Sequence, residues 1–193
     1  MIWNTNDNVM EKVPGGTELL NPLALLQRLH IDRGMVVADL GCGRAGFFAI
    51  QAGKIIGEQG TVYAVDVVKA VLSSVSSAIK QSGLRNVKTV WADLEVPKAT
   101  KIPDRSSDIA LLVNVLFQSR KREAIIREAA RVLKPGGKLL VIDWKTVNSP
   151  LGPPQERRVS PDTVRVAARN LGLLETDSFE AGQYHFGLIF SKK

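Results

Sequence analysis

Residues 36–47 read VVADLGCGRAGF. The apolar residues from Met35 to Ala38 predict a buried strand, which Asp39 and Leu40 close. The glycines at positions 41, 43 and 46 then let the backbone turn sharply, because glycine has no Cβ. The residues after Gly46 have a helical pattern. A strand, a glycine turn and a helix aim backbone N–H groups and the positive end of a helix dipole at one point, which suits a ligand with a carboxylate or a phosphate.

The spacing of these glycines, Gly41-x-Gly43-x-x-Gly46, is also that of the dinucleotide-binding fingerprint. Asp39, two residues before the first glycine, argues for a different ligand. Its carboxylate would repel a pyrophosphate and attract a cationic amino group, directly or through water. The turn therefore favours a nucleotide that bears an amino acid.

In these residues the chain resembles the class I S-adenosylmethionine-dependent methyltransferases, whose first motif is a strand followed by Asp-Leu-Gly-x-Gly. The resemblance covers roughly residues 35–145 and is closest to the small branch related to quinone biosynthesis. It implies an α/β fold with a doubly wound, mostly parallel seven-stranded sheet, helices on both faces and a C-terminal antiparallel hairpin. The family often has glycine where this chain has Ala45 before Gly46, so we expect a shifted turn that keeps the site.

Further cofactor residues are expected at the ends of the next strands. The run 61–65 predicts a second parallel strand, and Asp66 at its tip can accept two hydrogen bonds from a ribose diol. A carboxylate that caps the following helix is the alternative for Asp66. The resemblance implies that Asp93 and Leu94, after a strand at 86–91, hold the adenine, and that the segment 114–118, after a strand at 108–113, lies beside the methionine part of the cofactor. The predicted cofactor-binding residues are Asp39, Gly41, Cys42, Gly43, Gly46, Asp66, Val67, Asp93, Leu94 and Asn114.

Hydrophobic periodicity predicts the other elements. Helices are expected at 17–29, 47–56 with Gly57 as the cap, 69–81, 121–133 and 163–170, and strands at 173–179 and 184–190. The first helix could instead begin after Asn21, at Pro22. His30, at its end, is expected to be solvated or capping.

The helix at 121–133 is predicted to be amphipathic, with Glu123, Arg127, Glu128 and Arg131 facing solvent. Residues 133–137, LKPGG, predict a helix stop, a proline turn and the start of a fifth strand. The same residues resemble the segment that class I methyltransferases carry at this place.

The 193-residue chain is expected to form one domain, residues 17–193, after an irregular lead-in at 1–16. No apolar run approaches the roughly 20 residues of a membrane span, and the polar start is neither a signal nor a transit peptide. The single cysteine, Cys42, cannot form an internal disulfide, and two histidines suggest no metal site, so a cytoplasmic location is expected.

The net charge of +7 includes local clusters at 120–122, 157–158 and 192–193. We expect these cations to be solvated on helix faces and loop ends. A basic excess speeds encounters with anions, so nucleic acid remains open as a partner, although no RNA-binding signature accompanies the charge.

The sequence therefore predicts transfer of the S-adenosylmethionine methyl group to a small-molecule acceptor. An in-line displacement needs alignment of the acceptor and no protein nucleophile, so no residue is assigned a catalytic role. The aperiodic region 144–160 offers Trp144, Lys145, Arg157 and Arg158 as substrate-side candidates. The alternatives are an NAD(P)-binding oxidoreductase, a cofactor-binding subunit without turnover, and RNA methylation.

Overall fold

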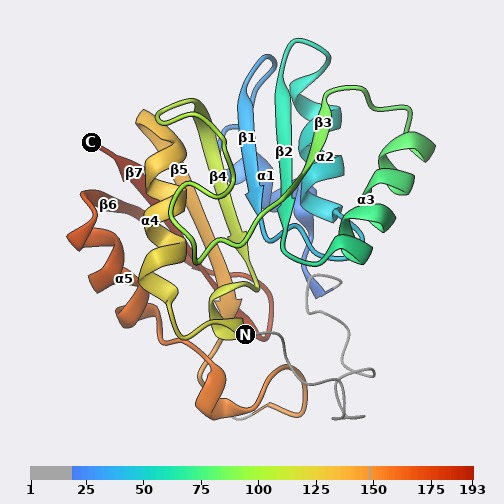
Figure 1. Cartoon of the computed structure of the whole chain (residues 1–193). Helices are drawn as coiled ribbons and strands as arrows, with labels where there is room; N and C mark the ends of the chain where they lie inside the picture. Colours follow the sequence, from blue (N-terminus) through green and yellow to red (C-terminus); the bar gives the residue numbers. More distant parts are fainter. Residues whose placement is uncertain (1–18, 148) are drawn as a thin grey trace.

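The computed structural model describes residues 19–147 and 149–193. They form a seven-stranded sheet, in the order β3-β2-β1-β4-β5-β7-β6, with helices packed against it (Figure 1). Strands β1 to β5 run parallel, and β7 is antiparallel to both β5 and β6. The strands are β1 (Val36–Leu40), β2 (Thr61–Asp66), β3 (Val87–Trp91), β4 (Ser107–Val113), β5 (Leu133–Trp144), β6 (Leu173–Glu180) and β7 (His185–Lys192). The predicted fold class, including the C-terminal antiparallel hairpin, is confirmed.

Helices cover both faces of the sheet. They are α1 (Pro22–Arg28), α2 (Phe47–Ile56), α3 (Lys69–Gln81), α4 (Arg122–Val132) and α5 (Pro161–Asn170), with short 3₁₀ helices η3 (Leu116–Gln118) and η4 (Gln155–Arg157). Apolar side chains of α1, α2 and α3 pack in one core cluster, and those of α4 and α5 pack in the other. Because both faces are covered, the central strands are apolar on both sides, as β4 shows from Ile109 to Val113.

The first described helix begins at Pro22, which confirms the second of the two starts that the sequence allowed. The Asn21 side chain accepts a hydrogen bond from the Ala24 N–H at 3.2 Å, and proline at the first helical position needs no donor. His30 is exposed just beyond the helix. The lead-in 1–16 and the alternative start at Thr17 lie outside the described residues.

The predicted turn at 133–137 is wrong in one respect, because these residues already belong to β5. Leu133 pairs with Ser107 and Lys138 pairs with Ile109, so the residues between them form a bulge in a continuous strand. Gly136 takes a φ of +78° within this bulge. At its other end β5 extends to Trp144, which pairs with His185 of β7 instead of starting a loop.

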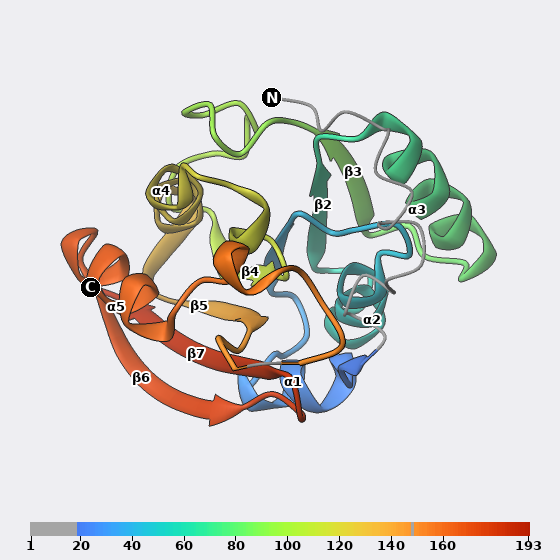
Figure 2. The ribbon, with the colours of Figure 1, turned by 90° about the horizontal axis from the view of Figure 1, so that it is seen from below.

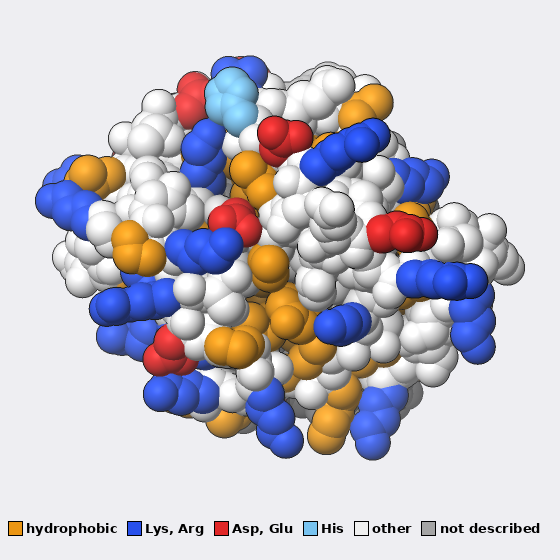
Figure 3. Space-filling model, turned by 90° about the horizontal axis from the view of Figure 1, so that it is seen from above, with side chains coloured by type: hydrophobic (Ala, Val, Ile, Leu, Met, Phe, Trp, Pro, Cys, Tyr) orange, Lys and Arg blue, Asp and Glu red, His pale blue; other side chains and the backbone are white. Residues whose placement is uncertain are grey.

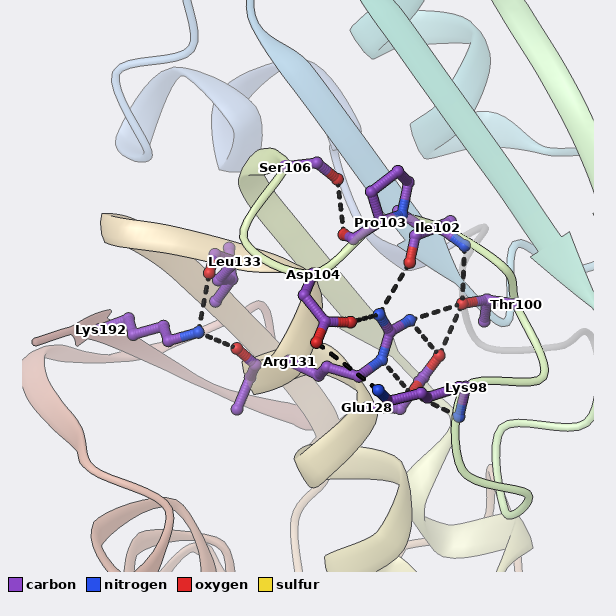
Figure 4. Close-up of polar contacts among 11 residues, drawn as sticks. Lys98, Thr100, Ile102, Pro103, Asp104, Ser106, Glu128, Arg131, Leu133 and Lys192 are labelled. Carbon is purple, nitrogen blue, oxygen red and sulfur yellow. Dashed lines mark hydrogen bonds and ion pairs between the residues drawn. The ribbon is translucent and has the colours of Figure 1, made fainter.

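The expectation that Glu128 and Arg131 face solvent is also wrong. The Glu128 side chain is only 2% exposed, and its carboxylate accepts hydrogen bonds from Arg131 and from the Thr100 hydroxyl (Figure 4). Arg131 also donates to the Ile102 carbonyl and the Asp104 carboxylate. The loop before β4 folds over this side of α4 and buries the pair.

Among the described residues, no helix combines the length and the hydrophobicity that a membrane span requires. Figure 3 shows the face at which the parallel strands begin. Lysine and arginine side chains are spread around that face with acidic side chains between them, and they do not form one continuous tract.

Candidate active site

The predicted cofactor residues come together at one edge of the sheet. Strands β3, β2, β1 and β4 are neighbours and parallel, so the residues that follow each strand lie at the same edge. Figure 2 looks at the molecule from below, toward this edge, and shows the connection from β5 to α5 passing across it. The glycine turn, Asp66 with Val67, Asp93 with Leu94, and Asn114 therefore share one end of the molecule.

The glycine turn is compact and leaves one open approach. A Cβ added at Gly41 would lie 2.5 Å from Cγ2 of Val115, and one at Gly46 would lie 2.9 Å from Cγ1 of Val75. At Gly43, by contrast, no other part of the described chain would lie within 4 Å of an added Cβ. The N–H groups of Gly41 and Cys42 both donate to the Val65 carbonyl, at 2.8 and 2.9 Å. Gly43 is thus the point at which a ligand can approach the backbone.

Gly46 ends the turn as the N-cap residue of α2, with a φ of +57°. The glycine that follows Ala45 thus supplies the left-handed residue needed to enter the helix. This geometry accounts for the shifted position of the third glycine.

Asp39 supplies a buried carboxylate behind the turn. The residue is 2% exposed, and its Oδ2 has no hydrogen-bond partner within the described part of the chain. Burial raises the pKa of Asp39 to about 7, against a lowering by the Ala49 backbone N–H and a further rise from nearby Asp66. A buried carboxylate oxygen without a donor fits a ligand that brings a cationic amino group.

Asp66 links the tip of β2 to the glycine turn. Its Oδ2 accepts the Gly43 N–H at 3.2 Å, and its Oδ1 accepts the Val68 N–H at 2.9 Å. The carboxylate therefore holds the loop before α3 to the glycine turn, and it makes no capping hydrogen bond to an N–H group of the helix itself. Each oxygen can accept a second hydrogen bond, so contact with ribose hydroxyls remains compatible with this position and stays a prediction.

The residues expected near the adenine and ribose have contrasting environments. Asp93 is exposed and accepts the Glu95 N–H at 2.8 Å, whereas Leu94 is buried. Val67 is 54% exposed, and its carbonyl accepts the Trp91 indole N–H. Cys42 is buried, and burial raises the pKa of its thiol, so the thiol stays protonated at neutral pH.

Asn114 begins the segment after β4 in a strained conformation. It is 3% exposed and has a φ of +57°, in the left-handed region that asparagine tolerates better than most residues. Its N–H donates to the Ile142 carbonyl at 2.8 Å, and its carbonyl accepts from the Gln118 side chain at 2.7 Å. The first contact ties the segment 114–118 to β5, and Val115 of the same segment packs against Gly41 of the glycine turn.

Asp143, at the end of β5, is a site residue that the sequence analysis missed. It is fully buried, and its Oδ2 accepts the N–H groups of Leu116 and Phe117 at 3.0 and 3.2 Å. Burial raises the pKa of Asp143 to about 7, although backbone N–H groups and Arg122 act in the opposite direction. The available signal was an aspartate in the apolar run LLVIDW, directly at the end of a central strand.

The substrate-side candidates form the connection between β5 and α5. Trp144 is 1% and Arg158 8% exposed, so the expectation that Arg158 is solvated is wrong. The Arg158 guanidinium donates to the carbonyls of four loop residues, Lys145, Val147, Leu151 and Pro153. Lys145 donates to the Gln183 carbonyl and pairs with Glu180. Arg158 thus holds the loop together from within, and Trp144 lies buried at its start.

Comparisons with known proteins agree with this geometry. The model of a methyltransferase domain family matches residues 31–172, more than half of the chain. The chain is 30% identical over 148 residues to the Ubiquinone/menaquinone biosynthesis C-methyltransferase UbiE of Azotobacter vinelandii, covering 76% of this chain and 57% of that protein. It is 30% identical over 126 residues to the Demethylmenaquinone methyltransferase of Listeria welshimeri, covering 65% of this chain and 51% of that protein.

The chain spans about half the length of these two relatives. Among solved structures, a SAM-dependent methyltransferase from Aquifex aeolicus superposes with a TM-score of 0.82 at 28% identity, over 98% of each chain. The family shown by these comparisons uses S-adenosylmethionine, which argues against the nicotinamide-dependent alternative. The chain belongs to the class I S-adenosylmethionine-dependent methyltransferases.

Proposed function

We propose that this methyltransferase acts on a small-molecule acceptor and that residues 17–193 work as one catalytic domain. Two observations support the acceptor class. The similar proteins named above modify quinone precursors according to their names. The segment after β4, Asn114-Val115-Leu116-Phe117-Gln118, also differs from the Asn-Pro-Pro-Tyr pattern associated with methylation of nucleobase amines and glutamine amides. A hydroquinone-type ring is the first acceptor to test.

The observation that carries the proposed site is the buried Oδ2 of Asp39, which has no hydrogen-bond partner in the described chain and lies behind the glycine turn. The Asp39 carboxylate would face the amino group of the cofactor, and Asp66 would accept the ribose hydroxyls. Asp93 and Leu94 would hold the adenine. Asn114 would border the methionine end, which leaves the segment 114–118 and the β5–α5 connection for the acceptor.

S-adenosylmethionine supplies a methyl group bound to a positively charged sulfur, and the acceptor atom displaces the sulfur in line. The protein's part is to hold the acceptor atom close to that methyl group, aligned and shielded from water. Both loops on the acceptor side are fixed by hydrogen bonds to buried side chains, those of Asp143 and Arg158. Such rigid walls suit a reaction that depends on alignment.

The first experiment is a thermal-shift titration with S-adenosylmethionine, S-adenosylhomocysteine, NAD and NADP. A ligand at about 100 times its dissociation constant stabilises by about 2.7 kcal/mol, which raises the midpoint by about 5–11 °C for a protein of this size. We expect this rise with the two adenosyl compounds only. Transfer of labelled methyl groups to hydroquinones, catechols, amines, thiols and RNA then identifies the acceptor. Labelling of RNA alone would contradict the proposed acceptor class.

A further inference from the structure

Arg122, at the start of α4, joins two loops that leave the sheet at the ends of different strands. One is the segment 114–118 after β4. The other is the β5–α5 loop, by which we mean residues 145–147 and 149–160. The Arg122 Nε donates to the Leu116 carbonyl at 3.1 Å, and its Nη2 donates to the Arg157 carbonyl at 2.9 Å. One planar guanidinium thus holds a carbonyl from each loop.

The first loop is firmly seated against the glycine turn. Val115 packs so closely on Gly41 that no side chain fits between them. The next residue, Leu116, has its N–H held by Asp143 and its carbonyl held by Arg122. Asn114 keeps its left-handed conformation within this arrangement, and such strain persists only where the surroundings enforce it. A ligand at the turn would therefore stabilise this segment directly.

The second loop behaves as one unit because Arg158 binds four of its carbonyls. It also rests on the sheet, since a Cβ added at Gly152 would lie 2.5 Å from the Trp144 ring. Arg157 is the last residue of η4, and Arg158 follows it directly as the C-cap. Holding that carbonyl therefore holds the whole loop relative to the segment 114–118.

We propose that Arg122 is a positioning residue that transmits cofactor binding from the glycine turn to the β5–α5 loop. The path runs from Gly41 through Val115 and Leu116 to Arg122, and from there to Arg157. Cofactor binding lowers the tendency of the segment 114–118 to open, and Arg122 extends that stabilisation to the loop that covers the acceptor. The enzyme thereby completes its acceptor side only after the cofactor is in place. This inference rests on the proposed location of the cofactor.

Hydrogen exchange measured by mass spectrometry tests the path without knowledge of the acceptor. The probe is S-adenosylhomocysteine, at about 100 times the dissociation constant of each variant so that occupancy is equal. The variants are Arg122→Gln and Arg122→Lys. Lysine keeps the charge but lacks the planar fork that reaches both carbonyls. Arg127→Gln is the matched control, because Arg127 lies on the same helix, is exposed and pairs only with Glu123 among the described contacts.

In the wild type and the control, the probe should slow exchange roughly threefold or more in peptides covering 36–47, 114–118 and 149–158. In both Arg122 variants the slowing at 149–158 should disappear, while that at 36–47 remains. Equal slowing at 149–158 in the wild type and either Arg122 variant would overturn the proposal, and so would its absence from the wild type. If the wild type shows no slowing even at 36–47, the proposed cofactor site itself is wrong.

Discussion

Gly43 and Gly57 both have a positive φ, of +68° and +67°, and at neither position does another described part of the chain come within 4 Å of an added Cβ. Replacement by alanine should destabilise both sites, by about 1–2 kcal/mol at Gly43 because a Cβ is strained at positive φ, and by at least as much at Gly57, whose ψ of −177° lies in a region that is essentially restricted to glycine. Only Gly43 lies at the proposed cofactor approach. We expect Gly43→Ala to weaken S-adenosylhomocysteine binding by calorimetry and Gly57→Ala to leave it unchanged. Equal affinities for the two variants would remove Gly43 from the site.

The Asp66 carboxylate can be tested in the same way. In the wild type the Asp66 carboxylate accepts hydrogen bonds from two backbone N–H groups. Asp66→Asn removes the negative charge and places a side-chain NH₂ group opposite one of these donors. Loss of hydrogen bonds to a charged group costs about 1.5–3 kcal/mol, so the dissociation constant for S-adenosylhomocysteine should rise roughly 10- to 150-fold. Asp177→Asn is the control. Asp177 lies on β6, far along the chain from the glycine turn, and pairs with Arg28 of α1. An unchanged dissociation constant for Asp66→Asn would exclude the ribose contact.

At the scale of elements, α4 shows how a loop can bury charges that periodicity assigns to solvent. Arg131 holds both oxygens of the buried Glu128 carboxylate at 2.8 Å (Figure 4). Burial raises the pKa of Glu128, but hydrogen bonds from Arg131 and Thr100 outweigh it and hold the pKa below its usual value. The carboxylate is therefore ionised at neutral pH and depends on Arg131 as its partner.

Arg131→Met should consequently cost about 3–5 kcal/mol of unfolding free energy, because it leaves a buried charge without its partner. Urea unfolding measures this loss. Arg127→Met, which removes an exposed pair on the same helix, should cost no more than about 1 kcal/mol. The double variant Arg131→Met/Glu128→Leu should recover much of the stability. A single Arg131→Met variant as stable as Arg127→Met would show that Glu128 finds another partner.

The sequence predicted regular elements well where local signals agree. The helices at 47–56 and 69–81 were predicted to the residue, since apolar periodicity ends at Gly57 in one and at Ser82-Gly83 in the other. It failed where distant segments determine the environment. The pairing of Leu133 with Ser107 turns a proline turn into a bulged strand, and the loop at 98–104 buries Glu128. Neither contact leaves a signal in the nearby residues.

At the scale of the whole molecule, the candidate active site also combines residues that local sequence signals predict with residues whose role depends on contacts between distant segments. The ten predicted cofactor residues lie in the last residues of neighbouring parallel strands or in the turns that follow them, so the parallel order alone gathers them at one edge. Asp143 and Arg122 escaped prediction because their partners are backbone groups of loops, and backbone groups carry no sequence signature. The backbone groups that a buried polar side chain will bind by hydrogen bonds can be identified only once the fold is known.

The two buried carboxylates, Asp39 and Asp143, make the stability of the cofactor-free protein depend on pH. Each has its folded pKa raised to about 7, well above its value in an unfolded chain. Between roughly pH 4 and 7 the folded state therefore binds more protons than the unfolded state, so these groups lower stability as the pH rises through that window. His185 acts in the opposite direction between pH 4 and 6.5, because burial, with nearby Lys145 and Arg158, lowers its pKa to about 4.

Comparison of the wild type with Asp39→Asn cancels the contributions of His185 and Asp143. We expect the unfolding free energy of Asp39→Asn, relative to the wild type, to increase from pH 5 to pH 8 in urea titrations at constant ionic strength. The reason is that only the wild type must then bury the ionised Asp39 carboxylate, whose Oδ2 has no donor among residues 19–147 and 149–193. S-adenosylhomocysteine should reverse this order at pH 8, since its amino group would compensate the charge in the wild type alone. A difference in unfolding free energy that does not change with pH would show that Asp39 does not titrate in this range. Equal stabilisation of both proteins by S-adenosylhomocysteine would show that the Asp39 charge takes no part in cofactor binding.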